Sequence, residues 1–359
     1  MIIIIGAGIA GLSLGYALTR RGSKVTILEA NEIASGASGV ATSYLEPRLG
    51  DTAMRKIEWE GMKRWPEFAG QLQQATGVDV GFQSGGQLRV TLEENEVKFN
   101  KDLKARAAQG WKFETLNSTE VMRFEPELSP ELVGGAYLPN VSWVTGKSVC
   151  IALAASIRNA GGIVRENCEV SEANGAKVTL NGGAKIEGDK VVFCTGLGAN
   201  IIDGRPSDIP QSRAVRGVNL LLDMSSLKTP ITHLIKHHRG NMCPRSDEKY
   251  GSHLIVGTTY EPDELNLVAD ADVIEKLYAN AAPILPKLRE LPLLGVTAGL
   301  RSKVGDGLLR LGRSTTVPTT YYSLSHAGAG FLRAPLISEE FADYILNGER
   351  GELTGSFTA

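Results

Sequence analysis

Three glycines and one acidic residue near the start of the chain have the types and spacing that dinucleotide binding requires. Gly6, Gly8 and Gly11 lie in the segment GAGIAG, and Glu29 ends the next apolar run. In such a pattern the first glycine permits a tight turn, the second lets a pyrophosphate approach the backbone, and the third lets a helix pack closely on a strand. A carboxylate at Glu29 can accept hydrogen bonds from a ribose diol and repels a 2′-phosphate. These residues predict a dinucleotide site that disfavours NADP, and either FAD or NAD satisfies them.

The elements that must position these residues are visible on both sides of the glycines. Ile2–Ile5 is a β-branched apolar run, typical of a buried parallel strand, and 25–28 predicts a second strand. Leu12, Tyr16 and Leu18 have roughly helical spacing. A helix that begins at the glycines directs unpaired N–H groups and its positive dipole end toward the phosphates. The alternative is a glycine turn with a structural role alone, and the strand–turn–helix–strand context favours the nucleotide site.

A second glycine-rich segment follows directly after the predicted second strand. Residues 34–39 read ASGASG, and residues 40–44 read VATSY. Small residues at this density let the backbone pack against a flat or phosphorylated group, whereas the alternative is a flexible loop. Its position just after the dinucleotide motif favours a cofactor contact.

Composition indicates an ordinary globular protein. The chain has 359 residues, 42% hydrophobic and 22% charged residues and a formal net charge of −2. This length favours two domains, and this charge gives no general attraction to nucleic acid or to an anionic membrane. No apolar run approaches the roughly 20 residues of a membrane span. Because the first predicted strand begins at residue 2, the sequence predicts no signal peptide and a cytoplasmic protein.

Metal binding is not favoured by the cysteines or the histidines. His233 and His237 are four positions apart, but on a strand such positions lie about 13 Å from each other. The cysteines are far apart, without a CxxC pair, which favours reduced thiols. They are Cys150, Cys168, Cys194 and Cys243.

Periodicity and turn residues predict the remaining elements. Helices are expected over 52–76 with a break at Pro66, and over 93–110, 147–160, 270–282 and 335–347. Strands are expected at 82–83, 87–90, 163–165, 177–180, 184–186, 190–194, 216–222, 231–243, 253–260 and 321–324. The strand-rich region from residue 213 onward predicts an antiparallel sheet with one exposed or ligand-facing side.

The pattern as a whole resembles the FAD-dependent D-amino-acid oxidase superfamily (the DAO family), nearest its glycine oxidase branch. The resemblance is carried by GAGIAG with Glu29, ASGASG, VVFCTGLGA, VRG at 215–217, CPR at 243–245, IVGTTYE at 255–261, AGLRSKVGDGLLRLG at 298–312 and SHAGAGFLRAP at 325–335. It implies an α/β fold in which a Rossmann-like FAD-binding domain of the GR2 type is interleaved with an antiparallel β-sheet substrate domain. The FAD-binding domain is expected at 1–78, 148–212 and 298–359, and the substrate domain at 79–147 and 213–297.

The resemblance also implies non-covalent FAD and a set of contacts to it. These contacts are Gly6, Gly8, Ile9, Ala10, Gly11, Glu29, Ala30, Ala37, Ser38, Ala41, Thr42, Ser43, Val170, Thr195, Gly196, Arg301, Gly328, Ala329, Gly330, Phe331 and Leu332. A covalent flavin is not expected, because no cysteine follows Cys243 near the turn that would bind the ring.

Arg301 matches the arginine that pairs with a substrate carboxylate in the resembling family, and its planar guanidinium can bind both oxygens. The alternative for Arg301 is a structural ion pair. Asn241 and Tyr260 are further catalytic candidates, with His253 as another candidate for the pocket. Three departures alter the pocket: Gly328 stands where an arginine is usual, Asn241 where a tyrosine is usual, and Tyr260 where an apolar side chain is usual. These departures argue against glycine itself as the substrate.

The chemistry that the resemblance implies is oxidation of the C–N bond of an amino acid or N-substituted glycine. Hydride transfer to flavin N5 gives an imine that water hydrolyses, and oxygen is the expected electron acceptor. The expected partners are therefore a small amine and oxygen, with no membrane, and nothing in the sequence specifies an oligomeric state. A non-enzymatic role, with FAD holding an interaction module together, is a less favoured alternative.

A second relative has the same chemistry on a larger substrate. The segments YLEPRL, VSWVTG and GTTY are similar to parts of the oxidase domain that removes carboxymethyl from carboxymethylaminomethyl-uridine in tRNA. The basic residues of the helix expected over 52–76 would then be the place to look for RNA contacts, although interleaved acids favour a solvated helix face. The acidic balance of the chain does not assist RNA binding.

Overall fold

The computed structural model describes residues 1–50 and 52–357 and contains two large β-sheets. The six-stranded sheet has the order β19 (Arg310–Arg313), β20 (Thr320–Leu324), β12 (Lys190–Phe193), β1 (Ile2–Ile5), β2 (Val25–Leu28) and β8 (Ile163–Arg165). Its strands pair in parallel except at β19. Every residue of β1 and β2 is buried, which accounts for their continuous apolar runs.

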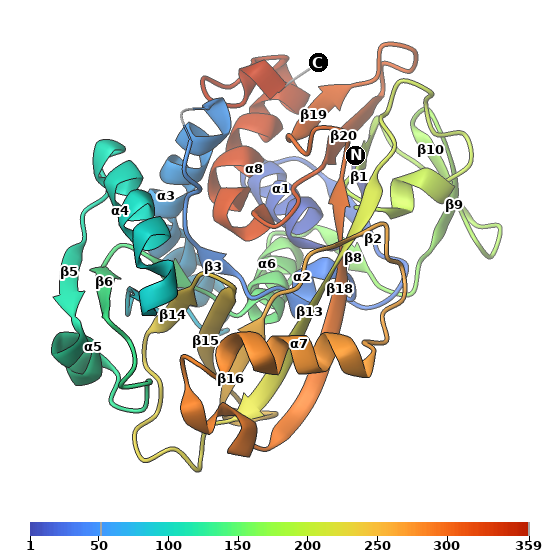
Figure 1. Ribbon diagram of the computed structural model, residues 1–359. Helices are drawn as coiled ribbons and strands as arrows, with labels where there is room; N and C mark the ends of the chain where they lie inside the picture. The colour runs from blue at the N-terminus through green and yellow to red at the C-terminus, as the bar shows by residue number, and fades with distance from the viewer. Residues whose placement is uncertain (51, 358–359) are drawn as a thin grey trace.

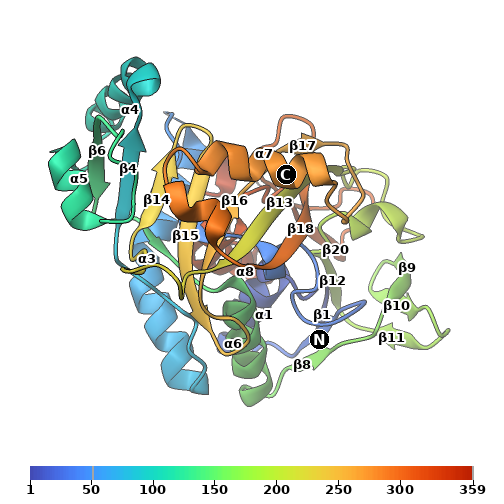
Figure 2. The same ribbon diagram turned by 60° about the horizontal axis from the view of Figure 1, so that its bottom comes forward.

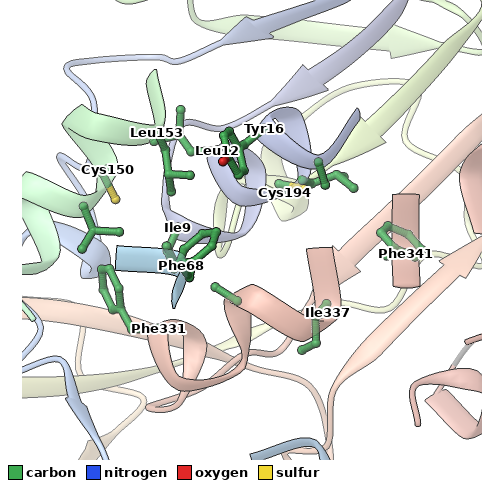
Figure 3. Packing of buried hydrophobic residues seen from close by; sticks show 14 of the residues in the cluster. Ile9, Leu12, Tyr16, Phe68, Cys150, Leu153, Cys194, Phe331, Ile337 and Phe341 are labelled. Carbon is green, nitrogen blue, oxygen red and sulfur yellow. The ribbon is translucent and has the colours of Figure 1, made fainter. Parts of the chain in front are cut away.

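Four helices form the main core beside this sheet. They are α1 (Ile9–Arg20), α3 (Ala53–Thr76), α6 (Gly146–Asn159) and α8 (Gly330–Asn347). Figure 3 shows Leu12 and Tyr16 of α1 in the same cluster as Leu153 of α6, Phe68 of α3 and Ile337 of α8. This packing fixes the N-terminal ends of α1 and α8, and those ends carry the two predicted cofactor-binding turns.

The nine-stranded sheet has the order β17, β13, β16, β15, β14, β4, β6 and β5, and β18 pairs with β13. The strands are β4 (Gln87–Thr91), β5 (Glu114–Asn117), β6 (Gly134–Leu138), β13 (Arg213–Asp223), β14 (Leu234–His237), β15 (Gly240–Asp247), β16 (Gly251–Gly257), β17 (Glu261–Pro262) and β18 (Leu293–Lys303). Helix α7 (Ala271–Ala281) lies along one face of β13, β15 and β16 (Figure 1). Alternate residues such as Val218 and Leu220 join the apolar core under α7, so the opposite face is turned away from that helix.

Smaller elements lie at the two ends of the molecule. Figure 2 shows α4 and α5 at one end and the three-stranded sheet of β9, β10 and β11 at the other. Their bounds are α4 (Glu96–Ala108), α5 (Ser118–Phe124), β9 (Val170–Asn174), β10 (Lys177–Leu180) and β11 (Lys185–Glu187). Between the large sheets run the short helix α2 (Ala37–Val40) and the pair β3 (Tyr44–Leu45) and β7 (Ser142–Trp143).

Two prolines do not limit helices as predicted. The break expected at Pro66 is wrong, because α3 is continuous and its buried residues Trp65 and Phe68 lie on both sides of the proline. The helix expected to begin at residue 335 begins at Gly330. Pro335 cannot donate to the carbonyl of Phe331, but the indole Nε1 of Trp65 donates to that oxygen at 2.9 Å. The vacant acceptor is satisfied from another helix, so the proline is tolerated.

Two further differences concern the second sheet. The strand expected over 231–243 is a hairpin of β14 and β15, and its turn lies at 238–239. The predicted domain boundary at residue 298 falls inside β18, whose eleven residues pair along β13. The division into two domains stays a prediction.

Candidate functional site

The turn between β1 and α1 has room for backbone alone. Gly6 has a φ of +104°, and a Cβ there would lie 2.6 Å from the carbonyl oxygen of Cys194. A Cβ on Gly11 would lie 2.0 Å from the carbonyl oxygen of Gly6. Both distances are impossible for a side chain, so the close approach of helix, turn and strand requires these glycines.

Glu29 is tied to this turn from the end of β2. Its carboxylate accepts a hydrogen bond from the backbone N–H of Ala7 at 2.7 Å and from that of Asn31 at 3.1 Å. Each carboxylate oxygen can accept more than one hydrogen bond, so capacity for a ribose diol remains. The predicted proximity of Glu29 to the glycine turn is therefore present in the fold.

A cleft opens along this edge of the six-stranded sheet. It is lined by Ile5, Gly6, Leu28, Glu29, Ala30, Cys168, Glu169, Val170, Thr195, Gly198, Ile201 and Ile202. The hydroxyl of Thr195 is buried there without a hydrogen-bond partner among the described residues. A buried hydroxyl without a partner is costly, and a bound polar group would satisfy it.

The segment that contains α2 joins the start of α1 to the second sheet. The hydroxyl of Ser38 accepts from the N–H of Ile9 at 3.0 Å, although Gly8, the N-cap of α1, has no side chain to do so. On its other side, α2 packs against β18 so closely that a Cβ on Gly299 would lie 2.4 Å from Val40. The small residues of this segment therefore let it fit between the two sheets.

The turn between β20 and α8 lies beside the same end of α1. A Cβ on Gly330 would lie 3.2 Å from the side chain of Ile9. Nη1 of Arg333 donates to the carbonyl of His326 at 3.3 Å, and Arg333 is in turn held by Glu58 at 2.5 Å. Burial lowers the pKa of His326 to about 4, so its imidazole is neutral at pH 7 and shares a hydrogen bond with Ser323 at 2.9 Å.

Arg301 lies on β18 and points to the same turn. A Cβ on Gly328 would lie 3.9 Å from Cδ and Nε of Arg301. The guanidinium donates to the carbonyls of Arg216 at 3.3 Å and Thr259 at 3.2 Å and to the hydroxyl of Thr258 at 2.9 Å.

No carboxylate of the described residues forms an ion pair with Arg301. Burial lowers the pKa of Arg301, and only the phenols of Tyr44 and Tyr260 oppose this shift. Since arginine remains protonated in proteins, Arg301 is a half-buried cation that lacks an acidic partner among the described residues.

The face of the second sheet that lies toward α2, here called the α2 face, carries two amides whose oxygens have no hydrogen-bond partner among the described residues. Asn219 of β13 and Asn241 of β15 pair with Gly257 of β16 from its two sides. The two side chains are 3% and 2% exposed, and neither Oδ1 has a hydrogen-bond partner among the described residues. Nδ2 of Asn219 donates to the carbonyl of Val40 at 3.1 Å, which directs its oxygen away from α2. Two buried acceptors thus flank Gly257.

The other two pocket candidates lie differently. Tyr260 is 63% exposed, although it still acts on the pKa of Arg301. His253 is buried but shares a hydrogen bond with the carbonyl of Gly251 at 2.9 Å within its own hairpin. The fold therefore brings Arg301, Asn219 and Asn241 to the α2 face, and it places His253 on the same face beside Arg245, with Nδ1 bonded to its own hairpin.

Comparison with known proteins identifies the family. Residues 1–344 match the family DAO, described as FAD dependent oxidoreductase. The chain belongs to this family.

The FAD-dependent oxidoreductase has relatives along its whole length. Glycine oxidase of Bacillus licheniformis is 26% identical over 352 residues, which cover 96% of this chain and 92% of that protein. A putative thiamine biosynthesis oxidoreductase, ThiO, of Rhizobium etli is 28% identical and covers 98% of both chains. The crystal structure of glycine oxidase from Bacillus cereus ATCC 14579 has a TM-score of 0.88 and 25% identity, and the match covers 99% of this chain and 97% of that one. These findings confirm the predicted α/β FAD-binding fold, the enzyme class and the cofactor.

The residues present fit FAD. Gly6 and Glu29 line the cleft, Glu29 can serve a ribose, and Thr195 offers a hydroxyl that lacks a partner among the described residues. From this edge, the start of α1, Ser38 of α2 and the β20–α8 turn form a continuous path to Arg301. The individual contacts predicted from the sequence stay predictions.

The described residues hold no group of three or more histidines, cysteines or acids that could hold a metal ion. None of the helices in the described part of the chain is both long and apolar enough to cross a membrane.

The sequence reasoning missed several polar residues of the α2 face. They are Asn219, Lys236, Arg245 and, from the facing β3, Tyr44. A signal was present for Asn219, because it is the one polar side chain inside the apolar run Val218–Leu222. For the others, the strand register that gathers them on one face depends on long-range pairing that no local pattern specifies.

Proposed function

We propose that this enzyme oxidises the C–N bond of an amino acid or an N-substituted glycine to an imine. Arg301 carries the proposal, because it is a half-buried guanidinium without an acidic partner among the described residues, beside the turn that would hold the flavin ring. A substrate carboxylate would supply the missing charge and two hydrogen-bond acceptors for the planar fork. The glycine oxidase relatives support an amino-acid substrate.

Each residue of the site has a definite role in this proposal. Bound FAD supplies a two-electron acceptor for the hydride, and oxygen takes up the electrons afterwards. Arg301 orients the carboxylate, so that the carbon that loses hydride is held in a fixed position. The amide oxygens of Asn219 and Asn241 accept hydrogen bonds from the amine, whose nitrogen forms the C=N bond as its proton is lost to water. Water then hydrolyses the imine to a carbonyl compound and an amine.

Anaerobic bleaching of the flavin absorbance by a panel of amines tests the proposal. The panel contains glycine, sarcosine, D-amino acids, longer N-substituted glycines and tRNA that bears carboxymethylaminomethyl-uridine. Bleaching by free amino acids supports a small-molecule oxidase, and the absence of bleaching with every member would overturn the proposal.

The same panel tests the alternative substrate, tRNA. Bleaching by the modified tRNA alone would assign the enzyme to nucleic-acid modification. Two of the basic residues of α3 are already paired, since Lys63 and Arg64 both contact Glu60 at 3.6 and 3.2 Å. No feature of the fold favours the tRNA over a free amino acid.

A further inference from the structure

Two further cations on the α2 face, Arg245 and Lys236, lack an acidic partner among the described residues, and Arg245, 8% exposed, donates instead to the carbonyls of Thr42 and Pro244. Lys236 of β14 pairs in register with Asn241 of β15, so their side chains share the α2 face. The ammonium of Lys236 donates to the hydroxyl of Tyr44 at 3.3 Å and lies 5.0 Å from the centre of that ring. No carboxylate of the described residues lies within ion-pair distance of it.

The neighbouring charges do not absorb this positive charge. Glu46 pairs with Arg89 and Arg106 at 2.8 Å each, and Asp102 pairs with the same two arginines at 3.1 and 2.8 Å. Burial raises the pKa of Glu46, but Arg89, Arg106 and Lys236 together bring it below its usual value. Two acids balance two arginines in this group, so Lys236 is a surplus cation.

Tyr44 connects this surplus cation to Arg301. The phenol of Tyr44 accepts from Lys236, and the same phenol acts electrostatically on the pKa of Arg301. Tyr44 directly follows residues 41–43, which are predicted to contact the flavin. The unpartnered oxygen of Asn241 lies on the strand next to Lys236. Three cations without an acidic partner among the described residues, Arg301, Lys236 and Arg245, therefore share this face with buried acceptors for an amine.

We infer that the substrate is a secondary amine with two carboxylates, that is, an N-(carboxyalkyl) amino acid. This inference rests on the proposed function and specifies its substrate. Arg301 binds the carboxylate next to the carbon that is oxidised, and Lys236 with Tyr44 binds the carboxylate of the N-substituent. The asparagine oxygens receive the amine between them. Gly328, which leaves the space beside Arg301 without a side chain, admits the larger substrate.

The test compares matched ligands on the FAD-loaded enzyme. Iminodiacetate and N-(2-carboxyethyl)glycine carry two carboxylates, sarcosine carries one, and N-(carbamoylmethyl)glycine replaces the second carboxylate by a neutral amide of the same shape. We expect the diacids to reduce the flavin at about 10- to 100-fold lower concentration than the two monoacids, because a charge-assisted hydrogen bond contributes roughly that factor. Lys236→Gln should remove this advantage and leave sarcosine within about twofold.

A matched control and a binding measurement separate the possible failures. Lys249→Gln removes an exposed lysine that also lies over a tyrosine ring, that of Tyr250, and it should change nothing. Diglycolate, which has an ether oxygen in place of the amine, cannot be oxidised in this way, and its binding is followed by the change in the flavin spectrum. We expect diglycolate to bind more tightly than methoxyacetate and to lose this advantage in Lys236→Gln. This result would support the two-carboxylate site even if no amine reduced the flavin. That outcome would overturn the proposed function and the amine substrate, and it would leave only a binding site for two carboxylates.

Other outcomes would overturn the inference. Equal reduction by diacids and monoacids would show that the second carboxylate is not recognised. An equal loss for both classes in Lys236→Gln would show that the lysine is structural. Reduction by monoacids together with unselective binding of diglycolate would leave the proposed function standing and remove the diacid.

Discussion

Two arginines, the buried Arg333 of α8 and the half-buried Arg301 of β18, have different kinds of partner in the fold. Arg333 of α8 is fully buried, and Glu58 of α3, 1% exposed, contacts it at 2.5 and 3.1 Å. Arg301 of β18 is held by two carbonyls and a hydroxyl and contacts no acid of the described residues. The first arginine is neutralised within the chain, and the second has no acid of the described residues to neutralise it.

Arg333 thus has a structural role, whereas the role proposed for Arg301 is functional. The Arg333–Glu58 pair fixes the turn at His326, to whose carbonyl Arg333 also donates. A buried pair of this kind must stay complete, because an isolated charge is expensive to bury. No acid of the described residues compensates the positive charge of Arg301. This is the arrangement expected where a bound ligand supplies the compensating charge.

The largest expected effect on stability is that of Glu58→Gln. The substitution leaves Arg333 buried without its counter-charge, so the free energy of unfolding should fall by about 3–5 kcal/mol. Urea unfolding of the FAD-loaded protein measures this loss. The double variant Glu58→Gln with Arg333→Met should recover most of it, because it removes the unpaired charge. If Glu58→Gln were as stable as the wild type, Arg333 would not need a carboxylate partner, and it would not differ from Arg301 in this respect.

Arg301→Met should give the converse result. We expect kcat/KM for the carboxylate substrate to fall about 100- to 1,000-fold, because the anion loses a bidentate cationic partner. The free energy of unfolding should not fall, since a half-buried cation without an acid is removed. Arg213→Met is the matched control on the neighbouring strand, where an exposed arginine pairs with Asp263 at 2.6 Å, and it should retain activity. A destabilised but fully active Arg301→Met would assign Arg301 a structural role.

The nucleotide side of this comparison could be predicted from the sequence. GAGIAG, the apolar strands around it and Glu29 are adjacent in the chain, so local spacing specified their geometry. The SHAGAGF turn could also be recognised as the start of a helix, although not its first residue. That residue depended on Trp65, whose indole satisfies the carbonyl released by Pro335 across a contact between two distant helices.

The substrate side could be predicted only in part. Arg301 was found through the family resemblance, but its lack of an acidic partner is a property of the fold. The α2 face draws on five strands, and a shift of one residue in any of them would turn its side chains to α7. Asn219, Asn241 and Lys236 meet only because of that register, which local patterns do not encode.

A third basic side chain, His237, avoids an uncompensated buried charge because its imidazole is neutral. His237 of β14 is buried, and neither ring nitrogen has a partner among the described residues. Burial lowers its pKa to about 3, and His238, Lys236 and Arg239 add to the shift. In the unfolded state His237 has a pKa of about 6.5 and binds a proton below that pH, whereas in the folded state it stays neutral. The free energy of unfolding therefore falls as the pH falls from about 6.5 toward 3.

His237→Phe should therefore flatten the dependence of stability on pH. Between pH 7 and pH 5 the wild type should lose about 2 kcal/mol more than the variant, as measured by urea unfolding at each pH. His238→Gln, at an exposed position of the same turn, should leave the slope close to that of the wild type. Parallel curves for the wild type and His237→Phe would mean that His237 keeps its proton when buried.

The smallest expected effect on stability is that of Ser38→Ala, at the nucleotide-binding end of α1. Its hydroxyl accepts from the N–H of Ile9 and so caps α1 from a separate segment, because the N-cap residue Gly8 cannot. Ser38→Ala should cost about 1 kcal/mol in the free energy of unfolding of the apoprotein, and FAD should bind less tightly by a comparable factor. Ser35→Ala is the control, since that exposed hydroxyl makes only a 3.4 Å contact with Glu29. If Ser38→Ala leaves both quantities unchanged, the start of α1 is held by its packing against α8 alone. Polar pairing within the chain would then stabilise the nucleotide-binding side less than the Arg333–Glu58 pair suggests.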